Sequence, residues 1–141
     1  MKNKRILTQN QSGVATIEAA FALPILLVMI FMMFQFAYIY RALSGIQHAL
    51  GQGARYATLC LSPTTLGCTA PTAANIKNVM NNAVYGIGPG TFTVPTPASG
   101  SSGTGNYFDL TVSYTQPTDL VFFTGPTVTV TRSKRVWVAG T

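Results

Sequence analysis

The chain has 141 residues, of which 48% are hydrophobic and only 9% are charged, and its formal net charge is +6. Three of its nine cationic residues lie in the first five positions, so the rest carries six cations against three acids, a net +3. So small an excess argues against nucleic-acid binding, and the low charge content argues against a soluble cytosolic enzyme.

Residues 1–13 form a short polar leader that contains Lys2, Lys4 and Arg5 and ends at Gly13. The three cations predict that this end stays in the cytoplasm, and that topogenic role is enough to explain them. A secretory signal would place an apolar core before a small-residue cleavage site, whereas here the polar leader comes first. A cut after Gly13 would therefore leave the following apolar segment in the mature chain.

Within residues 19–40 every residue is apolar except Pro24 and Gln35. Because a helix needs about 20 apolar residues to cross a bilayer, the sequence predicts a transmembrane helix over residues 14–41. Proline is tolerated in such helices. Gln35 is expected to contact another helix or lipid headgroups rather than to take part in chemistry, and Arg41 is typical of the far membrane interface.

The helical pattern continues beyond the predicted span to about residue 59. Apolar residues recur there at spacings of three and four, which predicts one face of an amphipathic helix packed on a domain over 42–141. They are Ile39, Leu43, Ile46, Leu50, Ala54 and Ala57. Gly45, Gly51 and Gly53 each weaken an isolated helix by up to about 1 kcal/mol, but they would admit a close neighbour.

Cys60 and Cys68 follow the predicted long helix and enclose a short loop, 60–68. If the N-terminus is cytoplasmic, both lie across the membrane, in an oxidising compartment where a disulfide is the expected state. Closing such a loop stabilises a fold by about 2–3 kcal/mol in the chain-entropy model. A metal site is the weaker alternative, because two cysteines without a nearby histidine leave the ligand set incomplete.

The remaining chain predicts a second helix over residues 71–86 and a β-region over residues 90–139. Alternating apolar residues predict a small antiparallel sheet of three or four strands. The expected strands are 91–94, 106–115, 120–123 and 127–138. Residues 95–105 are expected to be a flexible connection without core residues. In the last strand two cations interrupt the apolar face, so a bulge or bend is expected near Ser133. The fold class is therefore α+β with a membrane anchor.

No catalytic, metal or cofactor motif is recognisable in the sequence. His48 is the single histidine and lacks a partner identifiable by motif. Asp109 and Asp119 are isolated acids that nothing marks as a general acid–base pair. There is no glycine-rich phosphate loop and no zinc-ligand spacing. We therefore expect neither an enzyme nor a small-molecule substrate, cofactor or metal.

Glu18 is the candidate functional residue of this region, because its carboxylate directly precedes the apolar run. A carboxylate at the centre of a membrane span costs roughly 2.5–3.5 kcal/mol, and less near an interface. If the chain is cut after Gly13, the new amine of Val14 lies one helical turn from Glu18, and the two charges could pair within or between subunits. The alternative is an interfacial glutamate near a helix N-terminus, where the helix dipole favours it.

Taken together, the letters GVATIE at residues 13–18 and AAFALPILL at residues 19–27 resemble the start of a TadE-like protein. Such proteins are minor pseudopilins of the tight-adherence (Flp, type IVb) pilus systems of bacteria. Residues 54–57, ARYA, resemble the end of the family's long helix. The resemblance covers residues 13–59 and is only architectural beyond them.

This resemblance implies cleavage by a prepilin peptidase between Gly13 and Val14 and an assembly role for Glu18. It also implies a single-pass protein of the bacterial inner membrane whose C-terminal domain is periplasmic, and which either supports pilus assembly there or becomes a minor part of the extracellular pilus. Its expected partners are other pilins, the prepilin peptidase and the inner-membrane pilus assembly platform. The alternative is an uncleaved, signal-anchored periplasmic binding domain.

Overall fold

The computed structural model describes residues 12–60, 69–86, 88–103, 105–120 and 123–138. Its helices are α1 (Ser12–Thr58) and α3 (Ala73–Ala83). Its strands are β1 (Thr91–Thr93), β2 (Ala98–Ser102), β3 (Gly105–Gln116), β4 (Asp119–Leu120), β5 (Phe123–Thr124) and β6 (Val128–Val138). The predicted fold class is confirmed: a long apolar N-terminal helix, a short second helix and a small antiparallel sheet.

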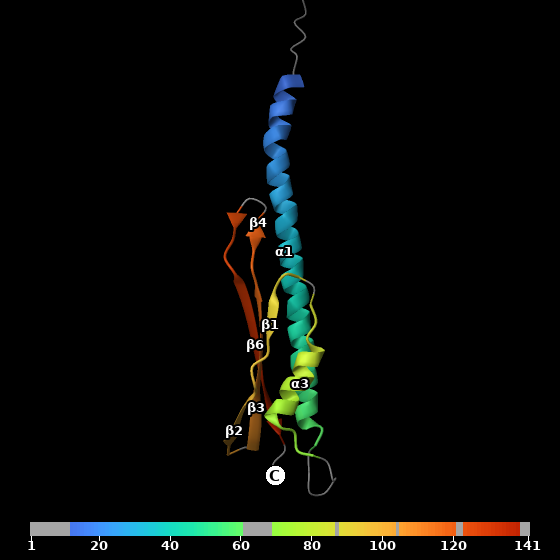
Figure 1. Cartoon of the computed structure of the whole chain (residues 1–141), viewed down its shortest axis with the longest axis vertical. Helices are drawn as coiled ribbons and strands as arrows, with labels where there is room; N and C mark the ends of the chain where they lie inside the picture. Colours follow the sequence, from blue (N-terminus) through green and yellow to red (C-terminus); the bar gives the residue numbers. More distant parts are fainter. Residues whose placement is uncertain (1–11, 61–68, 87, 104, 121–122, 139–141) are drawn as a thin grey trace, which may run out of the picture.

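Helix α1 has 47 residues, which at 1.5 Å per residue gives a rod about 70 Å long. It continues through Pro24 without a break. In Figure 1 the blue N-terminal part of this rod extends well beyond the end of the sheet, while the sheet and α3 lie along its C-terminal half. Local sequence explains the length, because no residue after Pro24 interrupts the helical pattern until the loop that follows Thr58.

Strand β3 is the centre of the main sheet. Strand β6 pairs with it along its whole length, from the pair Asn106–Val138 to the pair Gln116–Val128. The other edge of β3 is shared, because β2 pairs with its first half and β1 with its last three residues before Gln116. All these pairings are antiparallel, and β4 and β5 form a separate small hairpin.

Three expectations about the sheet were wrong. Residues 120–123 do not form one strand, because Asp119–Leu120 and Phe123–Thr124 are two separate strands that pair with each other. The segment 95–105 is not only a flexible connection, since it contains strand β2 and the buried Pro97. Strand β6 has no bulge near Ser133, because its register with β3 is continuous there. Arg132 and Lys134 stay on the helix-facing side but remain exposed at the rim, beside α1. Long cationic side chains can lie along such a rim with their charge in water, so no bend is needed.

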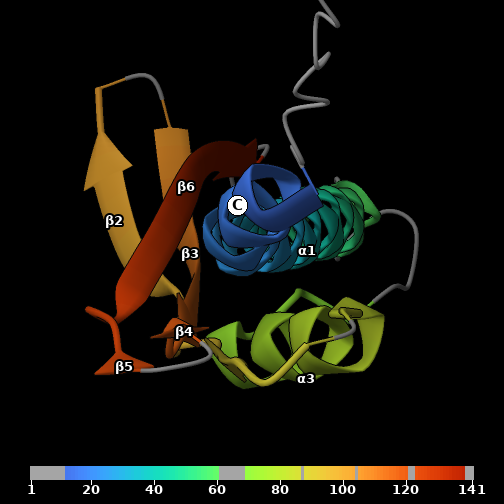
Figure 2. The ribbon, with the colours of Figure 1, turned by 90° about the horizontal axis from the view of Figure 1, so that it is seen from above.

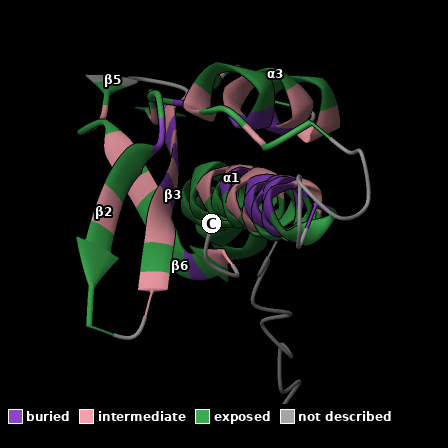
Figure 3. Ribbon diagram, turned by 90° about the horizontal axis from the view of Figure 1, so that it is seen from below, coloured by how far each residue is buried: buried purple, intermediate pink, exposed green. Residues whose placement is uncertain are grey.

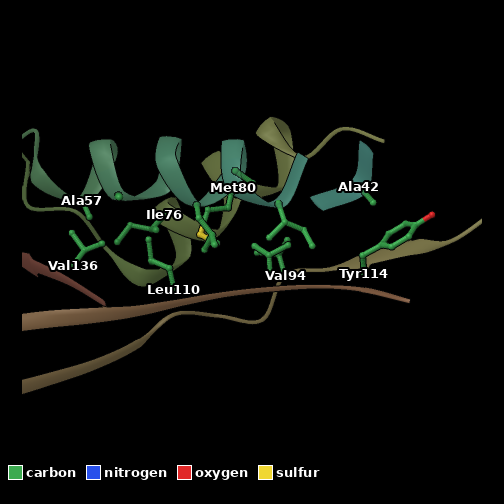
Figure 4. Packing of buried hydrophobic residues seen from close by; sticks show 13 residues of the cluster. Ala42, Ala57, Ile76, Met80, Val94, Leu110, Tyr114 and Val136 are labelled. Atoms are coloured by element: carbon green, nitrogen blue, oxygen red, sulfur yellow. The ribbon is translucent and has the colours of Figure 1, made fainter. Parts of the chain in front are cut away.

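The core lies where α1 meets α3 and the inner face of the sheet. Figure 2 shows α1 beside the sheet with α3 next to it, and Figure 3 shows buried residues on the facing sides of these elements. The close-up in Figure 4 shows side chains from both helices and from β3 and β6 interdigitating. Ile46, Ile76, Met80 and Leu110 are fully buried there. Thr72 caps α3 by accepting a hydrogen bond from the backbone of Asn75 at 3.3 Å.

Small residues on α1 let the segment around α3 come close. A Cβ atom built on Gly45 would collide with the carbonyl group of Tyr85, whose carbon would lie only 2.9 Å away. A Cβ atom on Gly53 would lie 2.8 Å from the sulfur of Met80. Gly51, in contrast, has open space at this position. Two of the three glycines of α1's second half are therefore required by packing within the chain.

His48 of α1 contacts the C-terminal end of α3 and the segment that follows it. Its Nδ1 atom lies 3.1 Å from the carbonyl oxygen of Ala83, which can only accept a hydrogen bond, so Nδ1 is the donor. Its ring also meets the Tyr85 ring edge to face, with 5.5 Å between the ring centres. These contacts give the single histidine a structural role at the C-terminal end of α3.

Candidate functional site: the exposed apolar half of the long helix

The N-terminal half of α1 presents large apolar side chains that nothing in the described part of the chain covers. An 18-residue window of this helix has a mean hydropathy of 2.4, and none of it is buried. Most of its large apolar side chains are exposed, by fractions that run from 39% at Met32 to 73% at Phe21, while Val28 and Phe31 are half-buried. A continuous exposed surface of large apolar side chains is typical of a contact with a membrane or with another protein. By length and composition α1 is able to cross a membrane.

The three residues predicted to act in processing and assembly lie together at the start of this surface. Gly13, Val14 and Glu18 are all exposed, and all belong to the first turns of α1, which begins at Ser12. A Cβ atom on Gly13 would meet nothing within 4 Å. Val14 is 67% exposed. The helix spacing of four residues places Val14 and Glu18 on the same side, one turn apart.

Glu18 makes no ion pair with any described residue of its own chain. It lies beyond the first turn of α1, which contains no acidic residue, so the helix dipole supports its charge only weakly. In an apolar environment a carboxylate is stable only with a partner of opposite charge or with hydrogen-bond donors. The geometry therefore leaves this carboxylate available to a charge from outside the folded domain.

The predicted disulfide falls partly outside the described residues. Cys60 is buried, with 6% of its surface exposed, directly after the end of α1. Cys68 belongs to the segment 61–68, which lies outside the described residues. The pairing of Cys60 with Cys68 stays a prediction. Among the described residues no group of three or more potential ligands could hold a metal ion.

Gln35 was expected to contact another helix or lipid headgroups. In the structure it is instead buried against the sheet. It accepts a short hydrogen bond from the side chain of Gln116, and its own amide donates to the backbone oxygen of Asp119 at 3.5 Å. Gln116 in turn accepts a hydrogen bond of 3.0 Å from the Tyr114 hydroxyl. Gln116 is fully buried and Gln35 is 9% exposed. These hydrogen bonds fix the position of the sheet along the axis of α1, at the level of Gln35.

Sequence reasoning missed Gln116, although a signal for it was present. Leu110, Val112 and Tyr114 alternate on the buried face of β3, and the next residue in that period is Gln116. The predicted strand stopped one residue earlier, at Thr115. Extending the alternation by one step places an amide on the core side, where it needs a hydrogen-bond partner. Gln35 carries the one side-chain amide in the apolar run and was therefore the natural candidate for the hydrogen-bond partner of Gln116.

The Gln35–Gln116 pair yields a prediction for stability. Gln116→Leu should lower the free energy of unfolding by about 1–3 kcal/mol, because it leaves the buried amide of Gln35 without its donor. The double variant Gln35→Leu/Gln116→Leu should be more stable than Gln116→Leu alone, because the Gln35 amide is then no longer orphaned, while the loss of the acceptor of the Tyr114 hydroxyl is common to both variants. Denaturant unfolding of the two variants and the wild type in detergent micelles checks this. Additive losses would contradict the pairing.

On the outer face of the sheet, Asp109 and Arg135 form an ion pair. The Arg135 guanidinium donates two hydrogen bonds, of 2.7 and 2.8 Å, to the Asp109 carboxylate. These bonds hold the pKa of that carboxyl below its ordinary value of 3.8, with a smaller contribution from the charge itself. The guanidinium also lies 4.0 Å from the centre of the Tyr107 ring. Asp109 is therefore a structural partner and not a free acid or base.

Comparison with known proteins gives one match. Residues 13–55 match the family model described as TadE-like protein. No curated protein and no solved structure matches the chain. The matched range covers the exposed apolar surface, Glu18 and the part of α1 that packs on the domain, so the resemblance seen in the sequence is confirmed over this helix.

Proposed function

We propose that this chain, whose long helix matches the TadE-like family, is a non-enzymatic minor pseudopilin. It would take part in the biogenesis of a Flp-type, type IVb tight-adherence pilus. The observation that carries the proposal is the wholly unburied apolar half of α1 with a single carboxylate, Glu18, near its start. The exposed apolar side chains of such a helix are buried by the lipid bilayer before assembly and by other apolar helices after it.

The proposed processing step is a cut by a prepilin peptidase between Gly13 and Val14. The peptide bond between them is hydrolysed, so Gly13 gains a carboxylate and Val14 gains an amine that is protonated at neutral pH. The amine then lies one helical turn from Glu18. Charge pairing between the amine of one subunit and Glu18 of another would set the axial register of neighbouring helices, because a shifted register strands a buried charge. The exposed position of Gly13, with open space around it, suits access by a peptidase.

The proposed location is the bacterial inner membrane, crossed once, with the leader in the cytoplasm and the folded domain in the periplasm. The cations of the leader support this orientation. In this setting Cys60 and Cys68 would form a disulfide. The proposed partners are other pilins and pseudopilins, the peptidase and the inner-membrane assembly platform.

The mature N-terminus tests this proposal. We expect the full chain, produced with its host's prepilin peptidase, to begin at Val14, and the chain produced without the peptidase to retain residues 1–13. Intact mass or Edman sequencing measures both. Gly13→Leu should block the cut, because a large side chain then replaces the small residue before the scissile bond.

The competing function is an uncleaved, signal-anchored domain that recognises a periplasmic or surface ligand. It requires no processing, so a chain that keeps residues 1–13 even with an active peptidase would contradict the pseudopilin and favour this domain. Correct cleavage of a known prepilin in the same cells is the control for peptidase activity.

A further inference from the structure

We propose that the cavity between α1 and the membrane-proximal end of the sheet binds one acyl chain of a membrane phospholipid. The cavity has a volume of about 210 Å³. Met32, Phe36 and Ile39 of α1 line one side, and Pro126 and Val128 line the other. The inference deepens the proposed function, because it rests on α1 being anchored in a membrane.

The lining of this cavity suits hydrocarbon. Apart from the five apolar side chains it includes only Gln35 and Thr118. The amide of Gln35 is engaged by Gln116 and by the Asp119 backbone, and the Thr118 hydroxyl donates a short hydrogen bond to the backbone oxygen of Pro126. A cavity whose polar groups are already engaged offers little to water and accommodates an apolar guest.

The height of the cavity along α1 places it at the edge of the bilayer. Residues 13–34 precede the first buried residue of α1, Gln35. The apolar run begins at Ala19, and about 20 residues at 1.5 Å each, which match the roughly 30 Å of a hydrocarbon core, extend from there to Tyr38. The far edge of the hydrocarbon core would therefore lie beside the start of the folded domain, at the level of the cavity residues Phe36 and Ile39. Figure 1 shows the upper end of the sheet beside α1 at the point where the blue rod begins to project.

The mouth of the cavity is continuous with the surface that would face lipid. Met32 and Phe36 line the cavity and are also 39% and 57% exposed. They extend the row of exposed apolar side chains that begins at Val14. An acyl chain from the adjoining leaflet can thus enter without crossing a polar surface.

The size of the cavity selects a hydrocarbon chain over a second copy of α1. An apolar cavity of about 150 Å³ holds a molecule the size of benzene, so this one takes a short length of acyl chain. A helix with its side chains is about 10–12 Å across and could only cover the mouth. The guest is therefore a lipid tail, and coverage by a second chain is the outcome that would contradict it.

Photolabelling of the unmodified full chain tests the proposal. The protein is placed in vesicles of phosphatidylcholine and phosphatidylglycerol that contain a phosphatidylcholine with a diazirine on one acyl chain. After illumination the labelled residues are identified by fragment mass spectrometry. We expect label on Val128 as well as on the exposed helix around Leu27, and none on Thr129, whose side chain lies on the opposite face of β6 and contacts Thr115.

A cavity-filling variant makes the test specific. Val128→Phe should abolish label on β6 and leave the label around Leu27 unchanged, with unfolding at a similar temperature. Label on β6 that persists in the folded variant, or label on Thr129, would overturn the proposal in favour of surface contact. So would a cross-link to a second copy at Val128.

The same experiment separates this inference from the proposed function. Label around Leu27 without label on Val128 would overturn the lipid site and leave the membrane anchor standing. No label in either place would overturn both, because α1 would then not lie in the bilayer.

Discussion

Gly45→Ala should destabilise the domain by about 1–3 kcal/mol, as is usual when an extra carbon is forced into a packed core. The new Cβ would collide with the Tyr85 carbonyl, which is backbone and cannot rotate away. The segment that follows α3 would have to move off α1, which would disturb the contact between His48 and Ala83 as well. Helices prefer alanine over glycine by about 1 kcal/mol, and the expected loss of stability is what remains after this gain is subtracted from the cost of the clash.

The matched control is Gly51→Ala, six residues further along the same helix. Nothing lies within 4 Å of the new Cβ there, so only the helix propensity acts and stability should rise by up to about 1 kcal/mol. Denaturant unfolding in detergent micelles measures both variants. Equal shifts in the two variants would mean that α1 and the Tyr85 segment do not pack as described.

Glu18→Ala should abolish or strongly impair pilus assembly while membrane insertion and domain folding stay intact. The residue is exposed and has no ion-pair partner among the described residues, so the folded domain loses nothing when it is removed. An assembly of apolar helices would lose the charge that sets its register. Pilus counts by electron microscopy and surface adhesion measure the effect, and the unfolding temperature of the purified variant checks the fold.

Two further substitutions at this position separate charge from shape. Glu18→Gln keeps the size and removes the charge, so it should behave like Glu18→Ala. Glu18→Asp keeps the charge and should retain part of the activity, because the carboxylate is withdrawn by one methylene group. Normal piliation in Glu18→Gln would contradict charge pairing and leave an interfacial glutamate, held by the helix dipole, as the explanation.

Much of the architecture could be predicted because the signals are local. The apolar run and the period of three and four fix the long helix within two residues of its observed C-terminal end at Thr58. Alternation fixes β3 and β6 almost as closely. A close neighbour was expected at Gly45, Gly51 and Gly53. It is present at Gly45 and Gly53 but not at Gly51, and the sequence could not name Tyr85 or Met80 as that neighbour.

Strand β2 could not be predicted, because its own residues carry no strand signal. The segment Ala98–Ser102 reads ASGSS, without alternation or β-branched residues. It forms a strand because β3 is long and β1 covers only three residues of its edge. Gly100 permits the pairing, since a Cβ there would meet the Tyr107 ring of β3. The available edge of a neighbour, and not local preference, decides this element.

The sequence by itself determined the long helix, its exposed apolar half and the position of Glu18, because hydropathy and helical period depend only on near neighbours. Only the tertiary structure decided how far the domain reaches along that helix. Gln35 and Gln116 are 81 residues apart, and their hydrogen bond depends on the register of β3 against α1. Such a register is set by long-range packing of the whole core, which no local pattern encodes.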